Sequence, residues 1–280
     1  MSEQKSPPFR RRLLGRTLRG LREKARLTTT EVCARLEISA ARLSRIENGQ
    51  TAPDLLVVKA LLDEYGIPVN DWEPYLDLAR EARKKSWWQL HGLPTMGYVA
   101  LESAANSVRE FALAYLPGLL QTRDYAAAVL GESLLNWTRQ QFEGHLAVRM
   151  RRQHRLTDPE DDFDLVAIVD EGALRRPVGG LEVMRAQLSH LAETAALPNV
   201  SLQVLPTAAG VHLGMASAFI VLGFPEQDIA DIAYIAHVAG SLQLEKAEQV
   251  RDCKLTFDRL RDKALGPAES VQLIRRLAEP

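Results

Sequence analysis

The chain has 280 residues, of which 46% are hydrophobic and 25% are charged, so it is long enough for two domains with separate cores. The formal net charge is −1, but residues 1–60 contain 13 Lys and Arg against 6 Asp and Glu, which leaves the remainder acidic. This asymmetry favours a basic nucleic-acid module attached to an acidic companion. No apolar run reaches the ~20 residues of a membrane span, and no signal peptide is recognisable, so we expect a cytoplasmic protein without a membrane partner.

The first predicted helix is amphipathic and follows a short basic segment. Residues 7–12 of that segment are expected to form a disordered arm. In the helix, arginines and apolar side chains lie on opposite faces, so the arginine face is suited to phosphate contacts. The arginines are Arg12, Arg16, Arg19 and Arg26, and the apolar residues are Leu14, Leu18, Leu21 and Ala25.

Residues 28–49 have the pattern of two short helices joined by a tight turn. Thr28 or Thr29 can cap the first helix and Ser39 the second. Asn48 and Gly49 end the second helix, because both residue types tolerate a positive φ. The apolar residues on the inner side are Val32, Leu36, Ile38, Leu43 and Ile46. The residues left facing outward on the second helix are Ala40, Ala41, Arg42, Ser44 and Arg45.

The outward residues of the second helix are suited to the major groove of DNA. Arginine forms paired hydrogen bonds with guanine, hydroxyls bind phosphate, and alanine methyls pack against thymine methyls. Together with the motifs LTTTE at 27–31, IS at 38–39 and SRIENG at 44–49, these residues identify a resemblance. Residues 13–67 resemble the five-helix lambda-repressor-type (Xre) helix-turn-helix domain, which implies binding to double-stranded DNA.

The resemblance also implies roles for individual residues. Because two of its base-reading positions are alanines, direct hydrogen-bond readout is left to two arginines, with DNA shape supplying the remainder. A structural ion pair is implied between Arg22 and Glu47. The base-reading positions correspond to Ala40, Ala41, Arg42 and Arg45, and the further DNA contacts to Thr29, Ser39, Ser44 and the backbone near Asn48.

The second half of the chain mixes apolar strands with helices. Helices alternate with strands in the centre and two consecutive strands follow, which predicts an α/β or α+β domain with a mixed sheet. The predicted strands are 107–115, 163–169, 200–205, 217–224 and 231–238. The predicted helices are 122–132, 136–156, 181–196, 245–264 and 268–278.

Three stretches of the second half carry a further resemblance, at residues 116–126, 170–180 and 198–206. They are similar to the C-terminal domain of unknown function in actinobacterial antitoxin-like Xre regulators, the WhiJ-like group. This resemblance implies a developmental or antibiotic-related regulator, often encoded beside a small partner protein. The expected organisation is a DNA-binding domain at 1–68, a linker with a helix at 69–97, and a regulatory domain at 98–280.

The sequence contains no motif that indicates catalysis. The histidines lack metal-ligand spacing such as HExxH, and no GxSxG elbow, P-loop or GxGxxG follows a strand. We therefore expect a regulator without enzyme activity, cofactor or metal.

Two roles remain open for the second domain. In the first, the domain forms a homodimer, which doubles the DNA contacts, and it binds the small partner protein. In the second, it senses a small effector, with the loops that contain Gln121 and His212 at the rim of a pocket.

Overall fold

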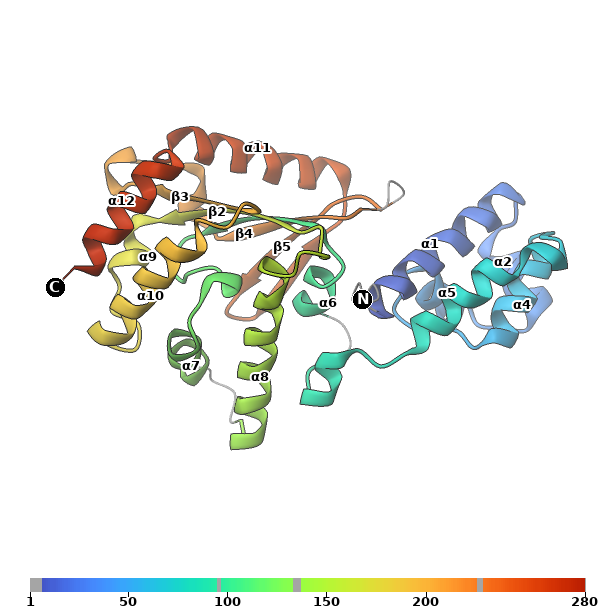
Figure 1. Cartoon of the computed structure of the whole chain (residues 1–280). Coiled ribbons are helices and arrows are strands. Elements are labelled where there is room, and N and C mark those ends of the chain that lie inside the picture. Colours follow the sequence, from blue (N-terminus) through green and yellow to red (C-terminus); the bar gives the residue numbers. More distant parts are fainter. Residues whose placement is uncertain (1–6, 95–96, 133–136, 226–228, 280) are drawn as a thin grey trace. The chain divides into compact units, whose positions relative to one another are not determined.

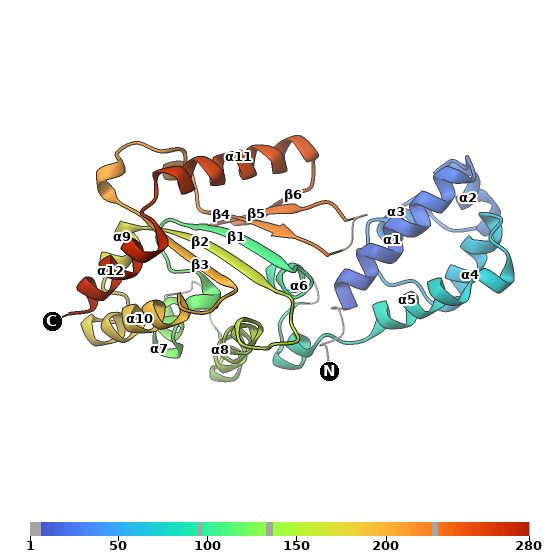
Figure 2. The same cartoon turned by 45° about the horizontal axis from the view of Figure 1, so that its top comes forward.

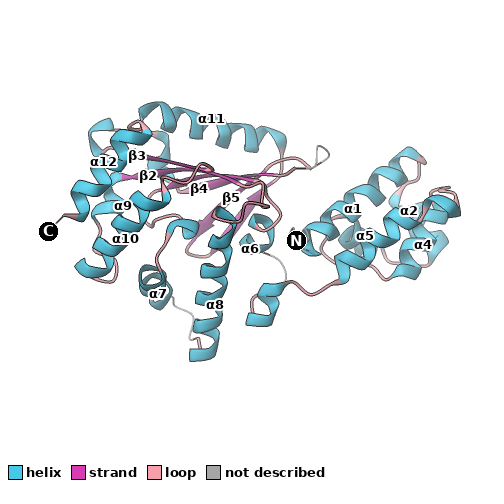
Figure 3. Cartoon of the chain, in the orientation of Figure 1, coloured by secondary structure: helices cyan, strands magenta, loops and turns pink. Residues whose placement is uncertain are grey.

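The computed structural model describes residues 7–94, 97–132, 137–225 and 229–279. The chain folds into two compact units. The first comprises the residues up to Leu90 together with Pro94–Ala104, and the second comprises His91–Leu93 and the residues from Ala105 onward. Figure 3 shows that the strands belong to the second unit and that the first is helical. The expected fold class, a five-helix helix-turn-helix domain followed by an α/β domain with a mixed sheet, is confirmed.

The first unit packs its helices around one apolar core, to which Leu14, Leu18, Leu43 and Leu61 contribute fully buried side chains. Apolar residues three and four positions apart give each helix a stripe that faces this core. The helices around this core are α1 (Pro7–Lys24), α2 (Thr29–Leu36), α3 (Ala40–Glu47), α4 (Leu55–Glu64) and α5 (Glu73–Arg83). The unit also includes the short helix α6 (Tyr98–Glu102), which adds no residue to this core.

Two segments of the first unit that were expected to be a linker and a disordered arm contain helix that packs into the unit. Helix α5 lies within residues 69–97, packs against α1, and places Leu76, Ala79 and Ala82 in the common core. The expectation of a disordered arm at residues 7–12 is wrong, because α1 already begins at Pro7. Proline is favoured in the first helical turn, and the burial of Phe9 fixes this turn to the unit.

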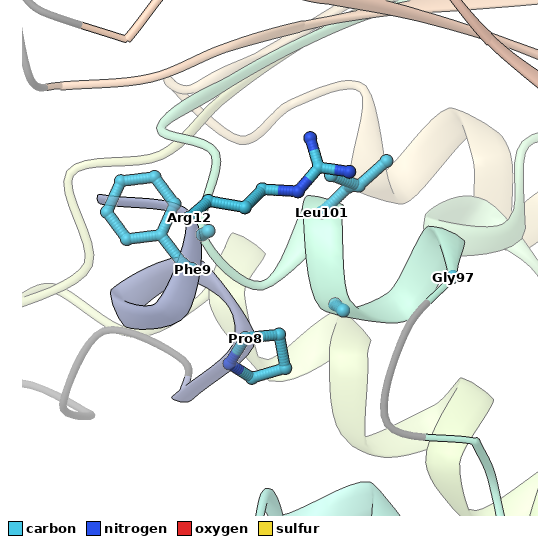
Figure 4. A pocket seen from close by; sticks show the side chains of 7 residues that line it. Pro8, Phe9, Arg12, Gly97 and Leu101 are labelled. Atoms are coloured by element: carbon cyan, nitrogen blue, oxygen red, sulfur yellow. The ribbon is translucent and has the colours of Figure 1, made fainter. Parts of the chain in front are cut away.

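A small pocket lies in the first unit between the start of α1 and α6. Figure 4 shows it lined by Pro8, Phe9 and Arg12 on one side and by residues around Leu101 on the other. Its free space is about that of a single water molecule, so it is a packing gap and not a ligand site.

The second unit is built on a six-stranded sheet with the order β3-β2-β1-β4-β5-β6. The first three strands in this order are parallel, and β4, β5 and β6 continue the sheet in antiparallel pairs. The strands are β1 (Ser107–Ala112), β2 (Asp164–Asp170), β3 (Val200–Leu205), β4 (Phe219–Gly223), β5 (Ile232–His237) and β6 (Gly240–Leu244). Strand β6 was not among the predicted strands.

Helices cover both faces of the sheet, as the buried parallel strands require. Helix α11 lies along one face and packs Val250, Phe257 and Leu260 against Phe111 and Ile168, whereas α7, α8 and α10 lie on the opposite side (Figures 1 and 2). The helices are α7 (Arg123–Gly131), α8 (Arg139–Arg152), α9 (Glu171–Arg175), α10 (Leu181–Thr194), α11 (Ala247–Lys263) and α12 (Pro267–Ala278). The first residue of the predicted helix 136–156 lies outside the described residues.

Candidate nucleic-acid interface

Helix α2 begins with a complete capping box. The Thr28 hydroxyl accepts a hydrogen bond from the Glu31 backbone N–H at 3.2 Å, and a Glu31 carboxylate oxygen accepts one from the Thr28 N–H at 2.8 Å. The hydrogen bond from the Thr28 backbone lowers the pKa of Glu31. Of the two threonines proposed as the cap, Thr28 has this role, and Thr29 is the first residue of the helix, partly buried. The capping box fixes where α2 starts.

The turn between α2 and α3 is also set by local chemistry. Glu37 ends α2 in the left-handed conformation, with φ at 51°. The Ser39 hydroxyl then caps α3 by accepting a hydrogen bond from the Arg42 backbone N–H at 3.2 Å. Because both ends of the turn are hydrogen-bonded or capped, the direction of α3 relative to α2 is well defined.

The residues of α3 divide cleanly into an inner and an outer set. Leu43 and Ile46 are buried in the core of the first unit, together with the carboxylate of Glu47. The side chains predicted to face DNA are all exposed, from the cap to the end of the helix: Ser39, Ala40, Ala41, Arg42, Ser44, Arg45 and Asn48. The structure thus gathers these residues on one surface, with Thr29 at the start of α2 partly accessible.

A buried ion pair connects α1 to the end of α3. Arg22 donates two hydrogen bonds to the Glu47 carboxylate, from Nε to Oε1 at 2.7 Å and from Nη2 to Oε2 at 3.0 Å. Its Nη1 also donates to the Leu27 carbonyl at 2.9 Å. The hydrogen bond with Glu47 raises the pKa of Arg22, and burial opposes this shift. With both partners more than nine-tenths buried, the pair fixes the orientation of α3 and leaves Arg22 unavailable to DNA.

Two glycines allow α1 to approach α3 closely. A Cβ atom at Gly15 would lie 2.4 Å from the Ile46 carbonyl oxygen, and one at Gly49 would lie 2.6 Å from the Arg12 Cα. Gly49 also has a positive φ of 66°. The turn role of Gly49 was visible in the sequence, but the packing role of both glycines was not, because it depends on which helices meet.

The outer surface of α3 contains two contacts between polar side chains. The Asn48 side-chain amide donates to the Ser44 hydroxyl at 3.2 Å. A terminal nitrogen of Arg42 lies 3.9 Å from a carboxylate oxygen of Asp54, which also caps α4. Both members of this ion pair are about half exposed, so it is weak and readily exchanged for another anion. Sequence patterns did not indicate Asp54 as a neighbour of Arg42.

In the second unit, Gln121 lies inside the fold. Its amide nitrogen donates to the Leu116 carbonyl at 2.7 Å, and its amide oxygen accepts from Arg149 at 2.8 Å. Gln187 holds the same loop by accepting from the Thr122 N–H and donating to the Leu120 carbonyl. The loop at 116–122 is therefore fastened by buried amides, and Gln121 does not face solvent.

His212 lies at the carboxyl ends of the parallel strands. Its Nε2 is 3.6 Å from a carboxylate oxygen of Asp170, which ends β2, and its ring packs edge-on against Phe111 of β1. A Cβ at Gly214 would come within 2.3 Å of the Phe111 ring, so this glycine lets the loop lie directly on the strand. The same loop exposes Val211, Leu213 and Met215, which are 82%, 55% and 61% accessible.

Within the residues that the structure describes, no group of three or more His, Cys, Asp or Glu side chains is arranged to hold a metal ion. In the same residues, every helix is too short or too polar to cross a bilayer.

The exposed, rigidly held α3 defines a helix-turn-helix protein, a class of DNA-binding regulators. Residues 13–73 match a family model described as a helix-turn-helix domain. Residues 95–276 match the model of a domain of unknown function, DUF5753, and the chain belongs to this family. No curated protein and no solved structure matches the chain.

Proposed function

We propose that the chain is a sequence-specific transcriptional regulator that binds double-stranded DNA in the cytoplasm and has no catalytic activity. The observation that carries this proposal is the outer face of α3, where Arg42 and Arg45 are exposed on a helix fixed by the buried pair Arg22–Glu47. A preorganised surface loses little side-chain and backbone freedom on binding, which favours specific readout.

We assign the base contacts to four residues of this face. Arg42 and Arg45 donate hydrogen bonds to guanine edges, and the methyl groups of Ala40 and Ala41 contact thymine methyls. The hydroxyls of Thr29, Ser39 and Ser44 and the backbone near Asn48 bind phosphates and set the register of the helix in the groove. On binding, Arg42 exchanges its weak contact with Asp54 for a nucleic-acid acceptor.

The assignment is tested with Arg42→Ala and Arg45→Ala in the full chain. Each substitution is expected to weaken binding to the cognate operator by about 1–3 kcal/mol at fixed salt, with little change in binding to unrelated DNA. Arg80→Ala is the matched control, because Arg80 is similarly exposed but lies on α5 in a pair with Glu73. Unchanged operator affinity in both α3 variants would contradict the assignment.

The finer classification is also a proposal. The resemblance of residues 13–67 supports membership of the lambda-repressor-type (Xre) group, and the three stretches of the second half support a WhiJ-like, antitoxin-like regulator of actinobacterial type. The match of the family model over residues 95–276 supports a separate second domain, and we propose that this domain is regulatory. We propose that this regulatory domain forms a homodimer and binds a small partner protein encoded nearby.

Partner binding is tested by titrating the full chain with the small protein encoded by the neighbouring gene. A rise in Tm that grows with partner concentration is expected, because binding to the native state alone stabilises it. No rise and no co-sedimentation at concentrations well above those in cells would contradict the partner proposal.

A second candidate function is that of a repressor which senses a small effector. The observation in its favour is the partly buried Asp170–His212 contact at the carboxyl ends of parallel strands, beside an exposed apolar loop. Ligands of open α/β sheets bind outside these strand ends. A rise in Tm with fractionated metabolites, abolished by His212→Ala and absent with the partner protein, would favour this function over partner binding.

A further inference from the structure

The two edge strands of the six-stranded sheet differ in what lies beside them. At the β3 edge, the Val204 carbonyl accepts a hydrogen bond from the Leu265 N–H, and the Val204 N–H donates to the Ser270 hydroxyl, both at 2.9 Å. The start of α12 therefore closes this edge. At the opposite edge, β6 pairs with β5 on one side and no strand of the described chain continues the sheet beyond it.

The β6 edge also lacks charges and prolines, two features that natural proteins use to prevent strands from pairing. In a chain with 25% charged residues, the segment 232–244 that forms β5, the turn and β6 contains no Asp, Glu, Lys or Arg. It contains no proline, and residues 240–243 of β6 are exposed. Exposed edges are normally protected by charges, prolines or bulges, so an uncharged open edge is suited to accept another strand.

The register of the hairpin specifies what the outer edge presents. Leu242 lies opposite Ile235, whose side chain packs into the core on the α11 side, so Leu242 lies on that face of the sheet. It is 50% exposed. His237 and Gly240 close a hairpin with a two-residue loop. In such a hairpin the closing residues form the hydrogen-bonded pair, and the pairs then alternate, so we infer that Ser241 directs its backbone N–H and C=O away from β5.

We propose that β6 is the homodimer contact, pairing antiparallel with β6 of a second copy across a two-fold axis at Leu242. This inference rests on the proposed homodimer and adds the surface that forms it. The axis places the two Leu242 side chains directly against each other in a non-hydrogen-bonded pair, where side chains approach most closely.

The occupant is a second copy because the edge is self-complementary. In this register Ser241 of one copy lies opposite Gln243 of the other, and no like charges meet across the strands. The part of the chain beyond residue 60 is net acidic, so two copies of this part avoid like-charge repulsion when they meet through an uncharged edge. The result is one continuous sheet across both subunits, in which the same patch of each copy forms an isologous contact.

The register is tested by disulfide formation in the full chain, with Cys33 and Cys253 first replaced by serine. Leu242→Cys is expected to give a covalent dimer on mild oxidation, because directly opposed residues in such a pair meet disulfide geometry. Ser241→Cys is the matched control: its two copies are offset by two residues and lie about 8 Å apart, beyond disulfide reach. It is expected to remain uncrosslinked.

Sedimentation equilibrium provides a second measurement. Leu242→Lys is expected to raise the dimer dissociation constant about tenfold or more, because two lysines then face each other. Leu255→Lys, at a leucine of similar exposure on α11, is expected to leave it unchanged. Circular dichroism checks that each variant is folded.

The possible results distinguish the β6 contact from the proposed homodimer and from DNA binding by α3. A wild-type dimer in which Leu242→Cys does not crosslink and Leu242→Lys does not dissociate would overturn the β6 contact and leave the homodimer standing. A monomeric wild type would overturn both. Neither result bears on DNA reading by α3, which the Arg42 and Arg45 variants test separately.

Discussion

The two units fix their surfaces with different kinds of buried polar group. In the helix-turn-helix unit, the charged pair Arg22–Glu47 holds α3 against α1. In the sheet unit, the loop at 116–122 and the β3 edge are fastened through the amides of Gln121 and Gln187 and the hydroxyl of Ser270, with Arg149 as one partner of Gln121. A buried charge without its partner costs far more than a buried amide without its partner, so the two units should differ in sensitivity to single substitutions.

The largest expected effect is that of Glu47→Ala. The substitution leaves the Arg22 guanidinium buried without its carboxylate and should lower the free energy of unfolding of the first unit by about 3–5 kcal/mol. Hydrogen exchange of α1 and α3 in the full chain measures this loss. Glu73→Ala is the control, because its pair with Arg80 is exposed and does not involve Arg22, so its loss should leave the stability nearly unchanged. Equal effects of the two substitutions would show that the buried pair is not what fixes α3.

A smaller effect is expected for Gln187→Ala in the second unit. Two backbone groups, the Thr122 N–H and the Leu120 carbonyl, then lose their partner, which should cost about 2–4 kcal/mol. Denaturant unfolding measures the loss, and exchange at residues 116–122 should report it locally. Ser189→Ala, at an exposed position of α10, should stay within about 0.5 kcal/mol of wild type. A loss of exchange protection confined to regions far from this loop would show that Gln187 does not hold the loop.

The same contrast explains how much the sequence could predict. The helix-turn-helix surface follows from short-range signals: Thr28 and Ser39 as caps, apolar spacing on the inner faces, and Gly49 at the end. The five predicted strands likewise follow from apolar runs. The segment 240–244 was missed as a strand because Gly, Ser and Gln outnumber its two leucines, and only its pairing with β5 makes it one.

Contacts that depend on topology could not be predicted. Asp170 and His212 are 42 residues apart in the sequence. They meet because β2 and β3 are parallel, so the end of β2 and the loop that follows β3 lie at the same end of the sheet. The closeness of Gly15 to Ile46 depends on the packing angle of two helices, which no local pattern contains. The burial of the Gln121 side chain could not be predicted either, since an amide is common both on surfaces and in buried hydrogen-bond networks.

The smallest expected effect concerns pH, and it should appear in one unit only. Residues 1–90 contain no histidine, whereas burial lowers the pKa of both His145 and His190 in the second unit. Below the ordinary value of about 6.5, the unfolded chain therefore binds more protons than the folded one. The contribution of these two histidines to the stability of the second unit is fully present above that pH and is lost as the pH drops toward the folded-state pKa values.

Hydrogen exchange at about pH 7.5 and 5.5, corrected for the intrinsic rates, should show reduced protection at pH 5.5 around α8 and α10 and unchanged protection in α1–α4. His190→Gln should reduce the pH dependence, because it removes one of the two histidines whose pKa burial lowers. A parallel loss of protection in the histidine-free helices would show that the two units unfold together and would refute a separate pH response.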